Sequence, residues 1–475
     1  MRKTLPLASL ALLAACTVGP EFKPAPPPAT GAGYGSDGGA RAALADGPWP
    51  SWWKSFGSPQ LDELVGRALT HNHSLAASLA TLERSRQRIA AVAGRRLPQV
   101  DGQARVEQQK VNLQAFGFDG LAGAGQAIEN PEFDLYTVGG GISYDLDLFG
   151  RNRRALEQAV AESEAEQRRV EAAHLIITGR VVAQVLAIAG LNDRIATQRA
   201  LLAEDERDVD LTQKRQKAGV GTLVEVLTAQ SQLSEDRARL PGLEQELAEA
   251  RNMLAILTGA SPAELGATDF SLDRLNLPAT VPVALPAALV HKRPDILEAE
   301  ARLHAATAAV GVATAQLYPD ITIGANMSQL AGNPGDLFKG KGNAFDIFGS
   351  LTAPIFHGGT LKAEQRGAEA EVRASAERYQ DVVLEAFRQV SDLLSALDTD
   401  GRTFSAQLES ARIAERNLYL SRRSFQVGNS GVLQVLDAGR SYQRARLALV
   451  EARSRQYLNV ARLYVATAGG WIGTP

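Results

Sequence analysis

The sequence predicts an α+β fold in which one series of elements occurs twice. The segment 217–229 is echoed by 426–438, with matching residues 209 positions apart. Two stretches of about 65 residues, 152–217 and 360–427, keep a helical pattern without a proline, and each would form a helix about 100 Å long. Strand-like segments precede both stretches, so we expect the order strand pair, long helix, turn and second helix in each copy.

The first copy is expected over residues 61–270. It opens with a helix over 61–97, which Pro98 ends. Apolar and polar residues then alternate with the period of a strand that has one apolar and one polar face. The elements predicted after the first helix are two strands at about 99–110 and 135–149, and a helical hairpin at about 152–258.

The second copy, over 280–475, repeats this order. Its predicted elements are strands at about 320–330 and 344–356, and a helical hairpin at about 360–468. A tight glycine turn folds each long helix back on a second helix. The turn glycines are Gly219, Gly221, Gly428 and Gly431.

The N-terminus predicts a lipid anchor. Basic residues at positions 2 and 3 precede an apolar stretch, and small residues lead to Cys16, which is the only cysteine. This pattern is typical of a bacterial lipoprotein signal, with 1–15 removed and 16–60 forming the lipidated N-terminal segment. An ordinary secretory signal with an incidental cysteine is the alternative. A single cysteine also excludes a disulfide framework.

The strands predict a membrane protein that forms an oligomer. After residue 16 no window offers the roughly 20 uncharged apolar residues of a membrane helix, and the nearest candidate, 172–191, is expected to be a buried helix. Four strands cannot close a barrel. Two chains would supply about 8 strands, whose interior is filled by side chains, whereas three chains would supply about 12 strands and begin to leave a lumen. The residues expected to face water in it are Asp101, Arg105, Glu107, Asp145 and Asp346.

Several function classes are disfavoured by composition and motifs. The formal net charge is only −3, which gives no field for nucleic-acid binding. Phosphate-loop, nucleophile-elbow and zinc-protease motifs are all missing from the sequence, so we expect no enzyme, no cofactor besides the lipid, and no metal. We expect surface histidines at His71 and His73, and helix capping in the segment 293–296.

Several ordered segments resemble those of outer-membrane efflux lipoproteins, a family of TolC-like channels. The segments are Gly19-Pro-Glu-Phe-Lys-Pro24, Trp52-Trp-Lys-Ser-Phe56, Arg96-Leu-Pro98, Asp145-Leu-Asp-Leu-Phe-Gly-Arg151, Arg293-Pro-Asp-Ile296, Leu436-Asp-Ala438 and Gly469-Gly-Trp471. The resemblance implies a trimer with a shared 12-stranded β-barrel, continuous with a long periplasmic α-helical barrel that carries an equatorial helical belt.

The resemblance also implies a gate at the periplasmic tip. Carried over by position, Leu433 would supply an apolar ring, Asp437 and Arg440 a polar latch, and Phe425 a neighbouring contact. The alternative for Asp437 and Arg440 is a solvated pair three residues apart on a helix, worth about 0.2–0.5 kcal/mol.

The function implied is that of a passive exit duct in the outer membrane of a Gram-negative bacterium. Its expected partners are two further copies of the chain, outer-membrane lipid, a periplasmic adaptor and a proton-driven inner-membrane transporter. The expected cargo is small molecules such as drugs or toxic compounds. The alternatives are the outlet of a protein secretion system and a lipid-anchored coiled-coil scaffold without a pore, against which the four alternating strands argue.

Overall fold

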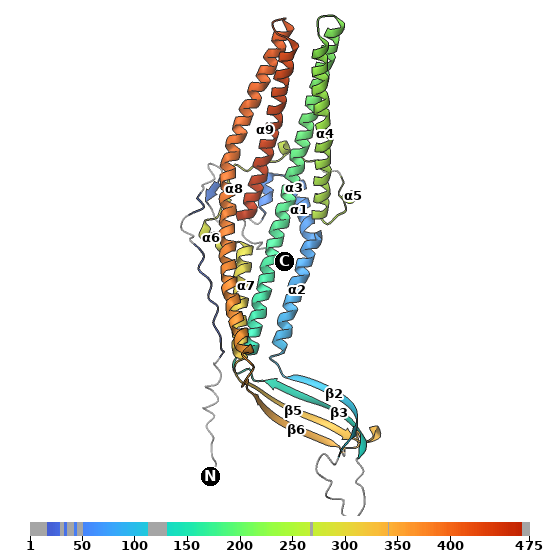
Figure 1. Cartoon of the computed structure of the whole chain (residues 1–475), viewed down its shortest axis with the longest axis vertical. Helices are drawn as coiled ribbons and strands as arrows, with labels where there is room; N and C mark the ends of the chain where they lie inside the picture. The colour runs from blue at the N-terminus through green and yellow to red at the C-terminus, as the bar shows by residue number, and fades with distance from the viewer. Residues whose placement is uncertain are drawn as a thin grey trace, which may run out of the picture. The chain divides into compact units, whose positions relative to one another are not determined.

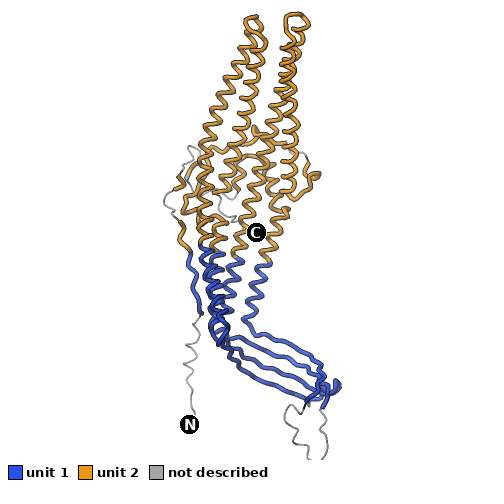
Figure 2. The backbone as a smooth tube through the Cα atoms, in the orientation of Figure 1, with its two compact units in different colours: residues 1–24, 84–163, 301–376 blue, residues 25–83, 164–300, 377–475 orange. Residues whose placement is uncertain are grey.

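The computed structural model describes residues 17–28, 33–35, 42–44, 51–112, 131–266, 269–340 and 342–467. The chain forms two compact units, shown in Figure 2. Unit 1 draws on residues 1–24, 84–163 and 301–376, and unit 2 draws on 25–83, 164–300 and 377–475. Each unit takes chain from both halves of the sequence. The two repeats at 61–270 and 280–475 therefore stay a prediction about the sequence and do not coincide with the compact units.

Unit 1 contains a four-stranded antiparallel sheet with the order β2-β3-β5-β6. Its strands are β2 (Gln99–Lys110), β3 (Glu132–Asp145), β5 (Asp320–Ala331) and β6 (Asn343–Thr352), labelled in Figure 1. The outer strands, β2 and β6, each leave one edge unpaired within the sheet.

The register of the sheet separates an apolar face from a polar face. One row across the four strands consists of Val100, Ile142, Ala325 and Ile347. The next row, on the opposite face, consists of Asp101, Gly141, Asn326 and Asp346. Val100 is 74% and Ile347 81% exposed in the single chain, so the apolar face is uncovered there. The alternation predicted from sequence is therefore the alternation of faces in the sheet.

Strands β3 and β6 end at Asp145 and Thr352, each earlier than the predicted ends near residues 149 and 356. For β3 the reason is the turn that follows, in which Asp147 has a left-handed backbone with φ +48°. Its carboxylate accepts hydrogen bonds from the backbone N–H groups of Asn152 (2.8 Å) and Arg153 (3.0 Å). The Asp147 carboxylate thus caps the N-terminus of the first long helix, and the strand ends where this turn begins.

Two hairpins of long helices dominate the chain (Figure 1). Hairpin 1 consists of α3 (Arg151–Lys217) and α4 (Leu223–Leu257), and hairpin 2 of α8 (Thr360–Gln426) and α9 (Val432–Thr467). Both α3 and α8 have 67 residues. These bounds lie within two residues of the predicted hairpins at about 152–258 and 360–468.

The helix predicted over 61–97 is two helices, α1 (Pro59–His71) and α2 (His73–Gly94), so the prediction of one continuous helix is wrong. The break falls at Asn72, whose backbone is extended. The buried Asn72 amide donates to the carbonyl of Leu257 (2.9 Å) and accepts from the N–H of Leu75 (3.0 Å). A tertiary contact therefore sets this break.

The remaining elements are short, apart from α7 (Pro294–Ala315). In unit 2 a parallel pair of strands, β1 (Ala42–Leu44) and β4 (Val281–Val283), accompanies several short helices. These are η5 (Trp52–Phe56), α5 (Pro262–Leu265), η8 (Leu272–Arg274) and α6 (Pro286–Val290). Unit 1 adds the single turn η9 (Pro334–Asp336).

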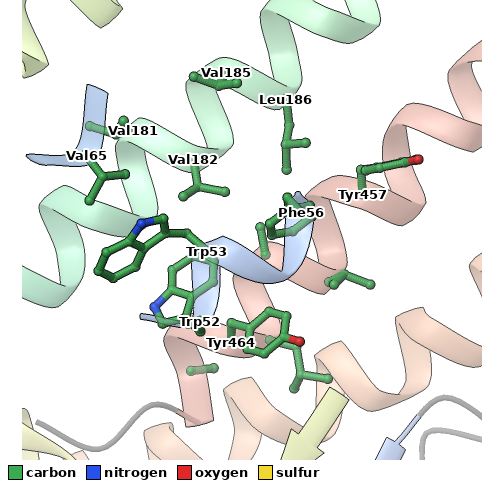
Figure 3. Packing of buried hydrophobic residues seen from close by; sticks show 14 of the residues in the cluster. Trp52, Trp53, Phe56, Val65, Val181, Val182, Val185, Leu186, Tyr457 and Tyr464 are labelled. Carbon is green, nitrogen blue, oxygen red and sulfur yellow. The ribbon is translucent and has the colours of Figure 1, made fainter. Parts of the chain in front are cut away.

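The core of unit 2 packs η5 against α3 and α9, as Figure 3 shows. Trp52 stacks on Tyr464 with ring centroids 5.2 Å apart, and Val182 and Leu186 of α3 are fully buried beside them. By length and composition, one window of α3 is apolar enough to cross a membrane. Its apolar residues instead contribute to this core, as expected for the stretch 172–191.

The motif at residues 293–296 fastens the end of α9. The buried Arg293 donates to the carbonyl of Ala466 (2.9 Å) and to both carboxylate oxygens of Asp295 (3.0 and 2.6 Å). It also reaches the side chain of Gln389 on α8 (3.2 Å). Asp295 accepts from the N–H of Ile296 (3.0 Å) in the first turn of α7. The motif combines the expected capping with a tie between three helices.

Candidate functional site

The candidate site is the pair of turns at the ends of the two hairpins, here called the tips. Gly219 (φ +74°) and Gly428 (φ +81°) both have left-handed backbones directly after a long helix. The next residue in each turn bonds back five positions, Val220 N–H to the Arg215 carbonyl (3.1 Å) and Asn429 N–H to the Ser424 carbonyl (2.9 Å). Both helices therefore end in the Schellman geometry that favours glycine.

The other two predicted turn glycines, Gly221 and Gly431, differ in how much space surrounds them. A side chain on Gly221 would meet the Arg215 side chain and the Gln216 backbone nitrogen at 3.0 Å, which is closer than ordinary van der Waals contact. Nothing lies within 4 Å of the equivalent point on Gly431. A side chain at 221 would therefore push the neighbouring atoms apart, whereas neither space nor a left-handed backbone requires a glycine at 431.

A cation–π contact joins the two tips. The guanidinium of Arg215, near the end of α3, lies 4.6 Å from the centroid of the Phe425 ring, near the end of α8. The same guanidinium donates to the Val220 carbonyl (3.0 Å), so it also braces its own turn. The role of Phe425 beside a gate stays a prediction. Arg215 was not predicted as a site residue from the sequence. The one feature that marks it in the sequence is its position among basic residues in the last turn of α3.

Leu433 lies in the first turn of α9. It is 49% exposed, whereas its neighbour Val432 is buried. The packed side of this hairpin end is a small cluster formed by Leu418, Val435 and Ala438, against which Phe425 and Tyr442 pack. Leu433 is not part of this cluster, and its place in an apolar ring stays a prediction.

Asp437 and Arg440 are both exposed on α9. Within the described chain no ion pair joins them, although they are three residues apart on one helix. The latch predicted for these two residues stays a prediction.

Exposed apolar side chains gather around both turns. They are Val220, Leu223, Val224, Leu227, Val427 and Leu433. Such a concentration of exposed apolar residues at the end of a structure is typical of a protein interaction site.

The predicted lipidation site lies elsewhere in the chain. Cys16 is outside the described residues, but the segment that follows it is held in unit 1, where Arg154 donates to the carbonyls of Val18 and Gly19, each at 3.2 Å. For metals, the described parts of the chain contain no group of three or more His, Cys, Asp or Glu side chains that could hold an ion. Both His71 and His73 are exposed.

Comparison with known proteins identifies the family. The sequence matches the outer membrane efflux protein family over residues 64–260 and 285–469. It is 32% identical, over 88% of this chain and 87% of the relative, to the pyoverdine export outer membrane protein OpmQ of Pseudomonas aeruginosa.

Solved structures agree with the sequence match. The outer-membrane channel OprN superposes with a TM-score of 0.86 at 27% identity, covering 96% of this chain and 100% of OprN. The open state of the MtrE outer membrane channel of Neisseria gonorrhoeae gives 0.81 at 25% identity, covering 96% and 99%. These are channels, not enzymes. The chain therefore belongs to the outer membrane efflux protein family and is an outer-membrane efflux channel of the TolC-like type.

Proposed function

We propose that three copies of the chain form one passive duct for small molecules. The observation that carries the proposal is the sheet of unit 1, which has two unpaired edges and one uncovered apolar face. Unpaired strand edges in lipid would each leave backbone groups without partners at several kcal/mol per group. Pairing β6 of one copy with β2 of the next gives the backbone groups of both edges their hydrogen-bond partners. Three copies then form a 12-stranded barrel, with the apolar face toward lipid and the polar face toward a lumen.

The helical hairpins continue the duct as a periplasmic α-barrel, with the short helices of unit 2 forming its equatorial belt. Hairpins of this length exceed what a globular core needs, and neighbouring copies would cover their exposed sides. The two hairpins have helices of matching length, which supports an internal two-fold repeat.

The tips are the proposed gate. Leu433, Asp437 and Arg440 are exposed in the single chain, so around a three-fold axis they can contact the neighbouring copies. Leu433 would form the apolar ring, and Asp437 of one copy would pair with Arg440 of the next. The contact between Arg215 and Phe425 would hold each pair of tips together in the closed state.

The proposed partners follow from the surfaces at hand. The apolar residues around the turns suit the helical tip of a periplasmic adaptor, which would couple the duct to a proton-driven inner-membrane transporter. The pyoverdine export of the Pseudomonas aeruginosa relative supports a small-molecule cargo. A lipid on Cys16 would anchor the N-terminal segment, and Arg154 would hold that segment just after the anchor.

The test is release of cargo of two sizes from vesicles that contain the purified trimer. The double variant Asp437→Ala, Arg440→Ala should release an entrapped small dye and retain an entrapped folded protein, while the parent releases little of either. Retention of the dye by the double variant in confirmed trimers would contradict the duct. Release of the protein would support the secretion outlet instead.

A further inference from the structure

A pair of buried carboxylates lies between the helices of hairpin 1, away from the tips. Asp205 of α3 is 5% exposed and Asp236 of α4 is 2% exposed. Carboxylates are rarely buried to this extent unless a cation or several hydrogen-bond donors compensate them.

Side-chain amides connect this pair to hairpin 2. Gln443 of α9 donates to Oδ1 of Asp205 (2.6 Å), and Gln232 of α4 donates to Oδ2 of Asp236 (2.6 Å). Gln232 also reaches the Oε1 atom of Gln443 (3.3 Å). The carboxylates and amides thus form one network that crosses from hairpin 1 to hairpin 2.

The network is short of positive charge. Among the described residues, the one cation within ion-pair distance of either acid is Arg239 of α4, 3.6 Å from Asp236. Arg239 is half-exposed and bound more closely to Glu235 at 2.7 Å. The second oxygen of Asp205, Oδ2, is buried and receives no hydrogen bond from the described residues. Asp236 therefore has one weakly engaged cation, and Asp205 is paired with none of the described cations.

The other groups that face the pair do not supply the missing charge. On α3, Asp208 adds a further acid near Asp205. Arg422 of α8 and Arg207 of α3 face Asp208, and Arg422 is bound to Glu204 at 3.1 Å, so its charge is already paired. On α9, Arg446 faces Tyr442, and burial raises the pKa of Tyr442 above its ordinary value.

The second copy of the repeat has no acidic residue at the two corresponding positions. At an offset of 209 residues, Asp205 corresponds to Ala414 and Asp236 to Ala445. The equivalent helices are of the same type and nearly the same length, so the hairpin fold does not require a buried acid pair. The pair is a special feature of hairpin 1.

We propose that Asp205 and Asp236 together bind one proton, and that this proton fastens hairpin 1 to hairpin 2. A protonated Asp205 would donate from Oδ2 to Asp236, which removes the repulsion between the two acids and keeps the amide network intact. Loss of the proton leaves two buried negative charges, which loosen the connection between the hairpins. The consequence for gating rests on the proposed duct, whereas the proton site itself does not.

The titration of Asp205 supports the proposal. Burial, and then the adjacent Asp236 carboxylate, raise the pKa of Asp205 to about 7. In the unfolded chain an aspartate has a pKa of about 4, so between pH 4 and 7 the folded protein holds a proton that the unfolded chain has lost. This contribution to stability is therefore full below pH 4 and is lost as the pH rises through 7.

Infrared spectroscopy of the full-length protein in detergent tests the proton site without reference to conduction. A band from a protonated carboxyl should be present at pH 5 and disappear with a midpoint near pH 7. In Asp205→Asn, which keeps the size and can donate to Asp236, that band should be gone. A band of the same intensity in Asp205→Asn, or no band titrating near neutrality in the parent, would overturn the proposal.

Single-channel recording then tests the effect on the hairpins. The open fraction of the parent should rise at least several-fold between pH 6 and pH 8. Asp205→Asn should stay at the low value, and Asp205→Ala, Asp236→Ala, which copies the second repeat, should not vary with pH. If the infrared band titrates but channel opening does not depend on pH, the proton site is supported and its role in gating is refuted. Absence of current from all variants would count against the duct instead.

Discussion

The contact between Arg215 and Phe425 permits a sharp test of how the tips are held together. The guanidinium lies 4.6 Å from the ring centroid, and the two residues belong to different hairpins. A cation–π contact at a partly exposed site is worth about 1 kcal/mol. In a trimer it occurs three times. Removing it should therefore favour separated tips by about 3 kcal/mol, which is roughly a 100-fold change in the equilibrium.

The variant is Phe425→Leu, which keeps an apolar side chain against the cluster of Leu418, Val435 and Ala438. The matched control is Tyr419→Leu, because Arg416 lies over the Tyr419 ring at 5.5 Å but both residues belong to α8. In single-channel recordings Phe425→Leu should raise the open fraction by up to about 100-fold, while Tyr419→Leu leaves it unchanged. Equal open fractions in the parent and both variants would refute the role of this contact.

Three further changes test other parts of the structure. Gly428→Ala strains a backbone at φ +81° and should cost about 1 kcal/mol per protomer, seen as a lower thermal midpoint of the trimer, whereas Gly431→Ala should not; equal midpoints would contradict the account of the turn. Arg293→Met removes the bonds that hold the end of α9 and should cost about 2–3 kcal/mol in urea unfolding, and an unchanged midpoint would show these bonds to be dispensable. Ile347→Lys puts a charge on the apolar face and should destabilise the barrel in the outer membrane by about 2–4 kcal/mol. The control Asp346→Lys lies on the polar face and should assemble normally, so equal yields of the two variants in membrane fractions would contradict the assignment of faces.

Local patterns predicted most of the regular structure. The strand expected at about 99–110 is β2, because the alternation of apolar and polar residues survives directly as the two faces of the sheet. The two hairpins were also predictable, because no proline interrupts the long helix that precedes each glycine turn. Gly219 and Gly428 are left-handed, as the turn positions suggested.

The missed boundaries depend on hydrogen bonds between polar side chains and the backbone, which the pattern of apolar and polar residues does not show. The amide of Asn72 bonds to the distant Leu257 carbonyl and breaks a helix that looks continuous in sequence. The cap made by Asp147 ends β3 early.

Contacts between separate helices were not predictable from spacing. Arg215 and Phe425 are 210 positions apart, and the acid pair of Asp205 and Asp236 connects to Gln443 on another hairpin. Each of these residues looks like an ordinary member of a solvated helix face when read in sequence. Only the pairing of the hairpins brings them together.

Single-channel conductance of the purified protein in a planar bilayer shows whether the chain forms a gated duct. The recordings compare the natural sequence with the double variant Asp437→Ala, Arg440→Ala. We expect a small or absent current for the natural protein and a sharp rise for the double variant. No current from either protein, with trimers confirmed in the bilayer, would refute the gated duct.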